Sequence, residues 1–141
     1  DPPVEWQPKG LLEKIESGAQ FVQTQFCFEP DVLQRYLERL EDFGVLDKIP
    51  LIVGVGPIAS VRSARWMNEN LFGVTVPEET IMRLDAADDE AAEGMKVGIE
   101  LIQTYHEMQG VSGVHIMAMA QGASRSAEVI EGSGVLSSRG K

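Results

Sequence analysis

Residues 21–55 read FVQTQFCFEPDVLQRYLERLEDFGVLDKIPLIVGV, and the order of patterns in this stretch decides the fold. Residues 21–28 are rich in aromatic and β-branched types, which predicts a strand. Pro30 then stands in the first turn of an amphipathic helix that we expect to stop at Gly44. Residues 49–55 form a continuous apolar run, which is typical of a strand buried on both faces. Strand, helix and buried strand in this order predict a right-handed crossover within a parallel sheet.

The flanking sequence extends the same alternation of helices and strands. A third strand is expected over residues 114–120, VHIMAMA. Further helices are expected over residues 9–17, 61–72, a short piece opened by Pro77, 89–109 and 124–131. Residues 132–141 are rich in Gly and Ser and predict a flexible tail. A sheet of only three strands keeps two exposed edges, so we expect a piece of a larger α/β fold, with a self-contained small domain as the alternative.

Composition and charge bound the class of protein. The 141 residues are 43% hydrophobic and include one cysteine, Cys27, so we expect a soluble chain in a reducing compartment, by default the cytoplasm. We expect neither a membrane span nor a signal peptide. The 12 Lys and Arg against 22 Asp and Glu give a net charge of −10, which disfavours nucleic acid and anionic membranes as partners.

Part of the negative charge is concentrated in one acidic stretch. Its members are Asp85, Asp88, Asp89, Glu90 and Glu93. Acidic residues favour the first turn of a helix because they face the positive end of its dipole. We interpret the stretch as a solvated loop and helix start, with a metal site as the less favoured alternative.

The first strand carries two glutamines on one of its faces. Unpaired amides are costly in a dry layer packed by helices, so the side that bears Gln25 is expected to face a barrel interior or a ligand cavity. A buried glutamine satisfied by backbone groups is the alternative. Alternation along the strand separates two sets, which are Phe21, Gln23, Gln25 and Cys27 on one side and Val22, Thr24, Phe26 and Phe28 on the other.

The second strand runs into GVGPIAS, residues 54–60. Its glycines are weak evidence for phosphate binding, because Ala59 breaks the pattern G-x-G-x-x-G and no P-loop lysine follows. Close approach of a flat ligand to Gly54 and Gly56 is an equal candidate. We expect Ser60 to cap the next helix.

The third strand carries His115, and no catalytic centre is recognisable around it. His115 and His106 are the two histidines of the chain, and with one cysteine they show no zinc or iron spacing, so we expect no metal. We interpret His115 as a structural histidine whose hydrogen bonds are satisfied. The chain lacks a nucleophile elbow and any recognisable Ser–His or Cys–His pairing, so we assign no catalytic residue to it.

Three segments together resemble the methylenetetrahydrofolate reductase family. They are KIESGAQFVQTQFCFEPD at 14–31, with the family's K-x-x-x-G-A and T-Q-x-x-F arrangement, PLIVGVGPIAS at 50–60 and GVSGVHIMAMA at 110–120. The resemblance implies that residues 1–141 are the C-terminal part of a single (β/α)8 TIM barrel, about strands six to eight with their helices. It also implies a flavin-dependent oxidoreductase of one-carbon metabolism and methionine biosynthesis, which reduces methylenetetrahydrofolate to methyltetrahydrofolate.

The resemblance assigns roles to matching residues. Gln25 aligns with a glutamine that hydrogen-bonds the folate pterin or the nicotinamide, and Lys14 aligns with a lysine that helps hold the dinucleotide part of the flavin. Phe26 fits the aromatic wall after the glutamine. At Ser63 and Gln121, which we also expect to contact the substrate, the family has a glutamine and an arginine, and it has an aromatic residue where this chain has Met67.

Cofactors and partners follow from the same resemblance. We expect FAD, with FMN as the alternative, and NADH or NADPH as electron donor. The general-acid glutamate and the flavin-contacting aspartate of the family belong to the N-terminal half of the barrel. We therefore expect this chain to be inactive without that missing half, and to have the folate substrate and further copies of the protein as its other partners.

Two alternatives stay open because the chain departs from the family pattern at Ser63, Ala120 and Gln121. The first is a non-catalytic half-barrel subunit for binding or assembly. The second is a related barrel that acts on another pterin-bound one-carbon unit.

Overall fold

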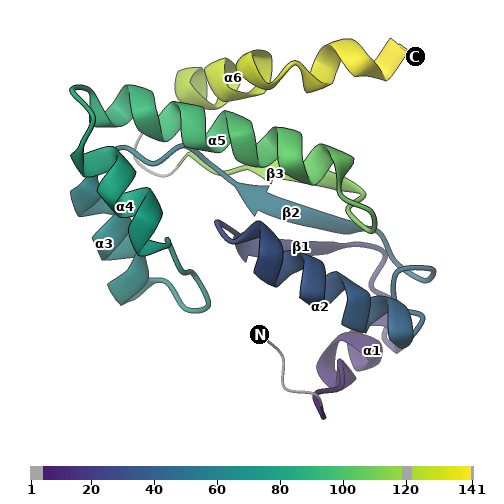
Figure 1. Cartoon of the computed structure of the whole chain (residues 1–141). Coiled ribbons are helices and arrows are strands. Elements are labelled where there is room, and N and C mark those ends of the chain that lie inside the picture. The colour runs from purple at the N-terminus through teal and green to yellow at the C-terminus, as the bar shows by residue number, and fades with distance from the viewer. Residues whose placement is uncertain (1–4, 119–121, 141) are drawn as a thin grey trace.

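Three parallel strands form one sheet in the computed structural model of the chain, which describes residues 5–118 and 122–140 (Figure 1). The strands are β1 (Val22–Phe26), β2 (Leu51–Val55) and β3 (Gly113–Ile116), and they lie in the order β1-β2-β3. The parallel α/β class predicted from the sequence is confirmed. Each strand is shorter than expected, and residues 119 and 120 of the expected third strand lie outside the described residues.

Every expected helix is present, with small shifts at the ends. The helices are α1 (Lys9–Glu16), α2 (Pro30–Asp42), α3 (Val61–Asn70), α4 (Glu78–Asp85), α5 (Glu90–Glu107), α6 (Gly122–Ser133) and the 3-10 helix η1 (Val135–Gly140). None of the helices in residues 5–118 and 122–140 is long and apolar enough to cross a membrane.

The expected tail over residues 132–141 needs a correction at its start. Helix α6 continues to Ser133, whose side chain is buried, and η1 follows. The reason is close packing of α6 on α5: a Cβ atom at Gly132 would lie 2.6 Å from Cδ1 of Ile99. A glycine that looks like a tail residue in the sequence is therefore a helix contact.

The two faces of the sheet differ in what covers them. Helices α2 and α5 run along one face, where Val53 of β2 is fully buried (Figure 1). The other face, which we call the open face, includes the side chains of Gln23 and Gln25, both exposed. The register puts Ile52, Gly54 and His115 on the side of Gln23. The expected alternation along β1 is interrupted beyond Gln23, because the register shifts there and pairs Phe26 with Gly54.

Helix α5 holds the segment that follows β2. Gly94 lies so close to this segment that a Cβ atom there would overlap the carbonyl oxygen of Ile58, whereas one at Gly98 would lie 3.5 Å from Cα of Pro57. At the start of the helix, the Glu90 carboxylate accepts a hydrogen bond of 3.0 Å from the backbone N–H of Val61. The helix backbone and one carboxylate thus fix the path of the chain from β2 into α3.

Gly94→Ala and Gly98→Ala form a matched pair of variants within one helix. Alanine normally stabilises a helix by about 0.5–1 kcal/mol over glycine, and we expect that gain at position 98, where the contact is ordinary. At position 94 the methyl group must displace backbone, so we expect the free energy of unfolding to fall by about 1–3 kcal/mol. Urea unfolding of the purified variants measures both effects. Two variants of equal stability would contradict the close approach at Ile58.

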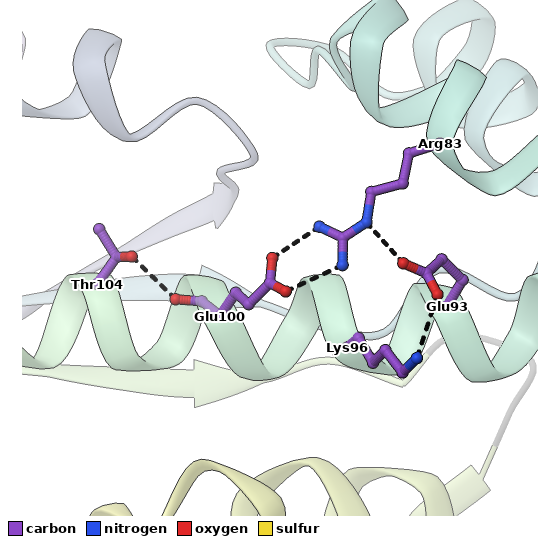
Figure 2. A network of polar contacts seen from close by, with 5 residues as sticks. All are labelled: Arg83, Glu93, Lys96, Glu100 and Thr104. Atoms are coloured by element: carbon purple, nitrogen blue, oxygen red, sulfur yellow. Dashed lines mark hydrogen bonds and ion pairs between the residues drawn. The ribbon is translucent and has the colours of Figure 1, made fainter.

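A network of ion pairs fastens α4 to α5 (Figure 2). Arg83 donates to the Glu100 carboxylate at 2.7 and 2.9 Å and to Glu93 at 2.7 Å. Lys96 lies 3.5 Å from Glu93 on its other side. Hydrogen bonds from Arg83 hold the pKa of both the Glu93 and the Glu100 carboxyl groups below the ordinary value.

The interpretation of the acidic stretch as a helix start is confirmed. Asp89 caps α5 by accepting a hydrogen bond of 3.0 Å from the backbone N–H of Ala92. Glu90 and Glu93 lie in the first turn. The Glu90 carboxylate accepts a hydrogen bond from the Val61 N–H, and the Glu93 carboxylate accepts one from Arg83. Within residues 5–118 and 122–140, no group of three or more His, Cys, Asp and Glu side chains is arranged to hold a metal ion.

Arg83→Ala is expected to lower the midpoint of thermal unfolding by a few degrees at neutral pH. The two carboxyl groups have a lowered pKa in the folded state, so their contribution is complete above the ordinary glutamate pKa of 4.5 and is lost as the pH falls through the lowered values. The difference between wild type and variant should therefore close in acid. Thermal unfolding followed between pH 7 and pH 3, a range set by these pKa values, is the measurement.

Arg65→Ala is the control for this series. Arg65 pairs with Glu78 at 3.0 Å, but both side chains are more than half exposed, and such pairs contribute little. We expect this variant to follow the wild type at every pH. A loss for Arg83→Ala that stays constant down to pH 3 would argue against the carboxylates as its cause.

Candidate functional site

A groove of about 620 Å³ follows β1, which is the edge strand of the sheet. Gln25 and Phe26 line it, whereas Lys14 and Ser63 do not. Most of its wall is apolar, and α1 and α2 close it from one side. The lining residues are Trp6, Leu11, Val22, Gln23, Thr24, Gln25, Phe26, Cys27, Val32, Leu33, Tyr36, Leu51 and Gly73.

Strand β1 is interrupted by a bulge at Thr24 and Gln25. The register shifts between Gln23 and Phe26, and Cys27 rather than Phe26 donates its N–H to the Gly54 carbonyl, at 2.9 Å. A bulge of this kind leaves one residue outside the ladder and turns the following side chains. Here it releases the N–H of Phe26 from the pairing with β2.

The released N–H orients the side chain of Gln25. The Phe26 N–H donates to Oε1 of Gln25 at 3.1 Å. With its oxygen engaged in this way, the amide directs its NH₂ group away from the backbone, as a donor for an acceptor atom in the groove. The exposed glutamine predicted from the sequence is thus held in one orientation by its own strand.

The hydroxyl group of Thr24 takes over the role of a backbone carbonyl. In a regular parallel ladder the Gly54 N–H would donate to the carbonyl of Thr24. In this sheet it donates to Oγ1 of Thr24 at 3.0 Å, and that hydroxyl donates to the Gln25 carbonyl at 2.8 Å. The Thr24 carbonyl, displaced from the ladder, lies over the open face, and its oxygen is 3.0 Å from Nε2 of His115.

Gly54 of β2 and Gly56 just after it allow close approach of neighbouring parts of the chain rather than of a ligand. A Cβ atom at Gly54 would lie 2.8 Å from the carbonyl oxygens of Thr24 and Gln25, and one at Gly56 would overlap the carbonyl oxygen of Met117. The room that the sequence analysis offered to a flat ligand is therefore filled by neighbouring strands. This finding corrects that candidate role.

The start of α3 is also committed to internal contacts. Ser60 caps the helix as expected, because its Oγ accepts from the backbone N–H of Ser63 at 3.1 Å. The Ser60 hydroxyl also donates to the Ser63 hydroxyl at 3.1 Å. The Glu90 carboxylate accepts a hydrogen bond from the N–H of Val61. The backbone N–H groups of Val61 and Ser63 are therefore occupied and do not offer a phosphate site.

Phe26 belongs mainly to the core beneath the groove. Its side chain is 5% exposed and its ring stacks on that of Phe28, with centroids 5.7 Å apart. Tyr105 of α5 fixes the chain just beyond, because its hydroxyl donates to the Cys27 carbonyl at 2.8 Å. Burial raises the pKa of the Tyr105 hydroxyl, so it remains a protonated donor.

The remaining predicted site residues lie apart from the groove. Lys14 is exposed in the last turn of α1, and Ser63 is in the cap of α3. Gln121 and Ala120 lie outside the described residues. His115 contacts the Thr24 carbonyl through Nε2, in keeping with a structural role for that ring nitrogen.

Two contributors were missed in the sequence. Thr24 precedes Gln25 in the T-Q pair, and its hydroxyl accepts a hydrogen bond from the backbone N–H of Gly54. Tyr105 lies in the helix expected over residues 89–109, but its hydroxyl partner is a backbone carbonyl 78 residues away. A contact of that separation leaves no local pattern in the sequence.

A family model described as methylenetetrahydrofolate reductase matches residues 2–134. The chain belongs to this family. The resemblance stated from the three sequence segments is therefore confirmed.

Two curated relatives come from Schizosaccharomyces pombe. Methylenetetrahydrofolate reductase 2 is 34% identical over 141 residues, which cover 93% of this chain and 21% of that protein. Methylenetetrahydrofolate reductase 1 is 28% identical over 98 residues, which cover 67% of this chain and 15% of that protein. The chain thus spans about a fifth or less of the length of these two relatives.

A solved structure shares the fold. It is an uncharacterized protein from Clostridium thermocellum that binds two copies of 5-methyl-5,6,7,8-tetrahydrofolic acid. The TM-score is 0.61 at 16% sequence identity, over 91% of this chain and 46% of that chain. The family member described here therefore corresponds to less than half of that neighbour.

Thr24→Val and Thr24→Ser test the bulge. Valine keeps the shape of the side chain but removes the acceptor for the Gly54 N–H, so we expect the free energy of unfolding to fall by about 1–3 kcal/mol. Serine keeps the hydroxyl and loses one methyl group, which costs at most about 1 kcal/mol. Urea unfolding compares the two variants. A valine variant as stable as the serine variant would show that the hydroxyl does not replace the carbonyl in the ladder.

Proposed function

We propose that this chain is the C-terminal part of a (β/α)8 barrel, about strands six to eight, in a flavoprotein that reduces methylenetetrahydrofolate to methyltetrahydrofolate. The observation that carries the proposal is the oriented amide of Gln25, which stands in the family's T-Q pair and lines the groove along the edge strand β1. Family membership supports the reaction class, and the folate bound by the Clostridium thermocellum neighbour supports a folate ligand.

The residues present fit a flat heteroaromatic ring. The groove offers a largely apolar wall with one oriented NH₂ donor, and folate pterin and nicotinamide both carry ring or amide acceptors. A bound flavin supplies hydride transfer between nicotinamide and folate. The part of Gln25 is to hold the ring by donating from its amide. Lys14, exposed on α1, would place a cation beside the pyrophosphate of FAD or the phosphate of FMN.

The free edge of β1 is the place for the missing half of the barrel in this proposal. An edge strand presents unpaired backbone groups, to which a further strand of the barrel can pair. The solved neighbour is more than twice the length matched by this chain, which leaves room for further strands. The general acid for the reaction comes from that other half. We retain cytoplasmic location, use of NADH or NADPH and assembly into a homo-oligomer as parts of the proposal.

A second candidate function is a non-catalytic subunit that keeps the fold and a bound ligand. Two observations favour it. The hydroxyl of Ser63 is engaged with Ser60, and Met67 is buried in the core with 4% of its surface exposed. These two positions replace a glutamine and an aromatic residue of the family pattern, so contacts from α3 to a folate are weaker in this chain than the family pattern implies.

The full-length protein purified with its flavin separates the two functions. We expect a yellow protein that oxidises NADH or NADPH in the presence of methylenetetrahydrofolate. Gln25→Ala should lower kcat/KM by about 10- to 100-fold, which corresponds to the loss of one buried hydrogen bond to a ligand. Gln20→Ala is the matched control, because Gln20 is also exposed but does not line the groove.

Two outcomes contradict the reductase. A colourless protein would argue against the flavin, and a well-folded yellow protein without reductase activity would favour the non-catalytic subunit. If Gln25→Ala behaves like Gln20→Ala in an active enzyme, the assigned role of Gln25 is wrong. Activity with a different pterin-bound one-carbon unit would redirect the substrate but keep the site.

A further inference from the structure

His115 crosses the whole sheet on its open face. It lies on β3 in register with Gly54 of β2, yet its Nε2 meets the Thr24 carbonyl of β1 at 3.0 Å. Position 54 of β2, between these two strands, has no side chain, and a Cβ atom there would lie 2.6 Å from Cε of Met117 and 2.8 Å from the Thr24 carbonyl oxygen. A carbonyl oxygen only accepts hydrogen bonds, so the ring carries its hydrogen on Nε2. One side chain thus links the first and third strands above the second.

The carbonyl that His115 holds is the one displaced by the bulge. The Thr24 hydroxyl accepts the hydrogen bond from the Gly54 N–H. Without His115, the Thr24 carbonyl would therefore lack a partner on a half-buried face. Such an unpartnered carbonyl is unfavourable, which would favour a return to the regular ladder. The histidine therefore stabilises the bulged arrangement against the regular one.

The bulged arrangement is also the one that orients Gln25. In the regular ladder Phe26 would donate to the Gly54 carbonyl, and its N–H would no longer hold Oε1 of Gln25. We propose that His115 is a positioning residue for the ligand amide: by holding the Thr24 carbonyl it keeps Gln25 turned toward the ring that it binds. This proposal rests on the proposed function.

Affinity for methyltetrahydrofolate in the full-length flavoprotein tests the proposal. His115→Asn places its NH₂ group too close to the backbone to reach the Thr24 carbonyl, and we expect the Kd to rise about 10-fold, or about 1.4 kcal/mol. His115→Gln carries its nitrogen at nearly the distance of Nε2 and should restore the Kd to within about threefold of wild type, a difference of under 1 kcal/mol. His115→Phe keeps the ring volume without the donor and replaces the asparagine variant if that one does not fold.

A double-mutant cycle with Gln25→Ala distinguishes positioning from a merely structural role. If His115 acts through Gln25, then His115→Asn should add nothing to the Kd once Gln25 is alanine. Additive effects on Kd, or a lower unfolding temperature with an unchanged Kd, would overturn the proposal and leave the proposed function intact. A wild-type protein that binds neither flavin nor methyltetrahydrofolate would overturn both.

Discussion

The missing side chain at position 54 constrains both the sheet and the candidate site. Gly54 lies in the central strand, and the carbonyl oxygens of Thr24 and Gln25 would come within 2.8 Å of any Cβ atom placed there. These carbonyls occupy that space because β1 is bulged opposite Gly54. A larger residue would push β1 back toward a regular ladder, with Gln25 in a different orientation. The hydrogen bonds around Thr24 and Gln25 thus depend on the absence of a side chain at Gly54.

The packed face supplies the rigidity that the bulge requires. Tyr105 holds the Cys27 carbonyl immediately after β1, and Gly94 lets α5 approach the segment after β2. Both contacts come from one helix, so α5 fixes the ends of two neighbouring strands at once. The Arg83 network then fastens α4 to the same helix. A helix anchored at so many points can keep strand ends in place while the other face of the sheet stays available to a ligand.

Local patterns in the sequence predict the elements but not the bulge. Apolar periodicity, Pro30 and Gly44 locate helix α2, and the apolar run at 49–55 locates β2, because these signals depend on neighbouring residues. The orientation of Gln25 depends instead on contacts with Gly54 and His115, the latter bonded to a residue 91 positions away. The same limit explains why the sequence left close approach of a flat ligand as a candidate role for Gly54 and Gly56. Their spacing suits a ligand as well as a neighbouring strand, and only the fold distinguishes the two.

The departures from the family pattern make the oriented amide more important in this chain than family membership alone would suggest. Ser63 is short and engaged with Ser60, so it replaces a glutamine without offering a second amide to a ring. Met67 packs into the core, so it does not provide an aromatic face. In the proposed function, ring recognition within the described residues therefore falls mainly to Gln25. A single donor discriminates between ligands only when its direction is fixed, because a freely rotating amide accommodates many acceptors at similar cost. The proposal thus requires that the bulge and the His115 contact fix the direction of this one amide.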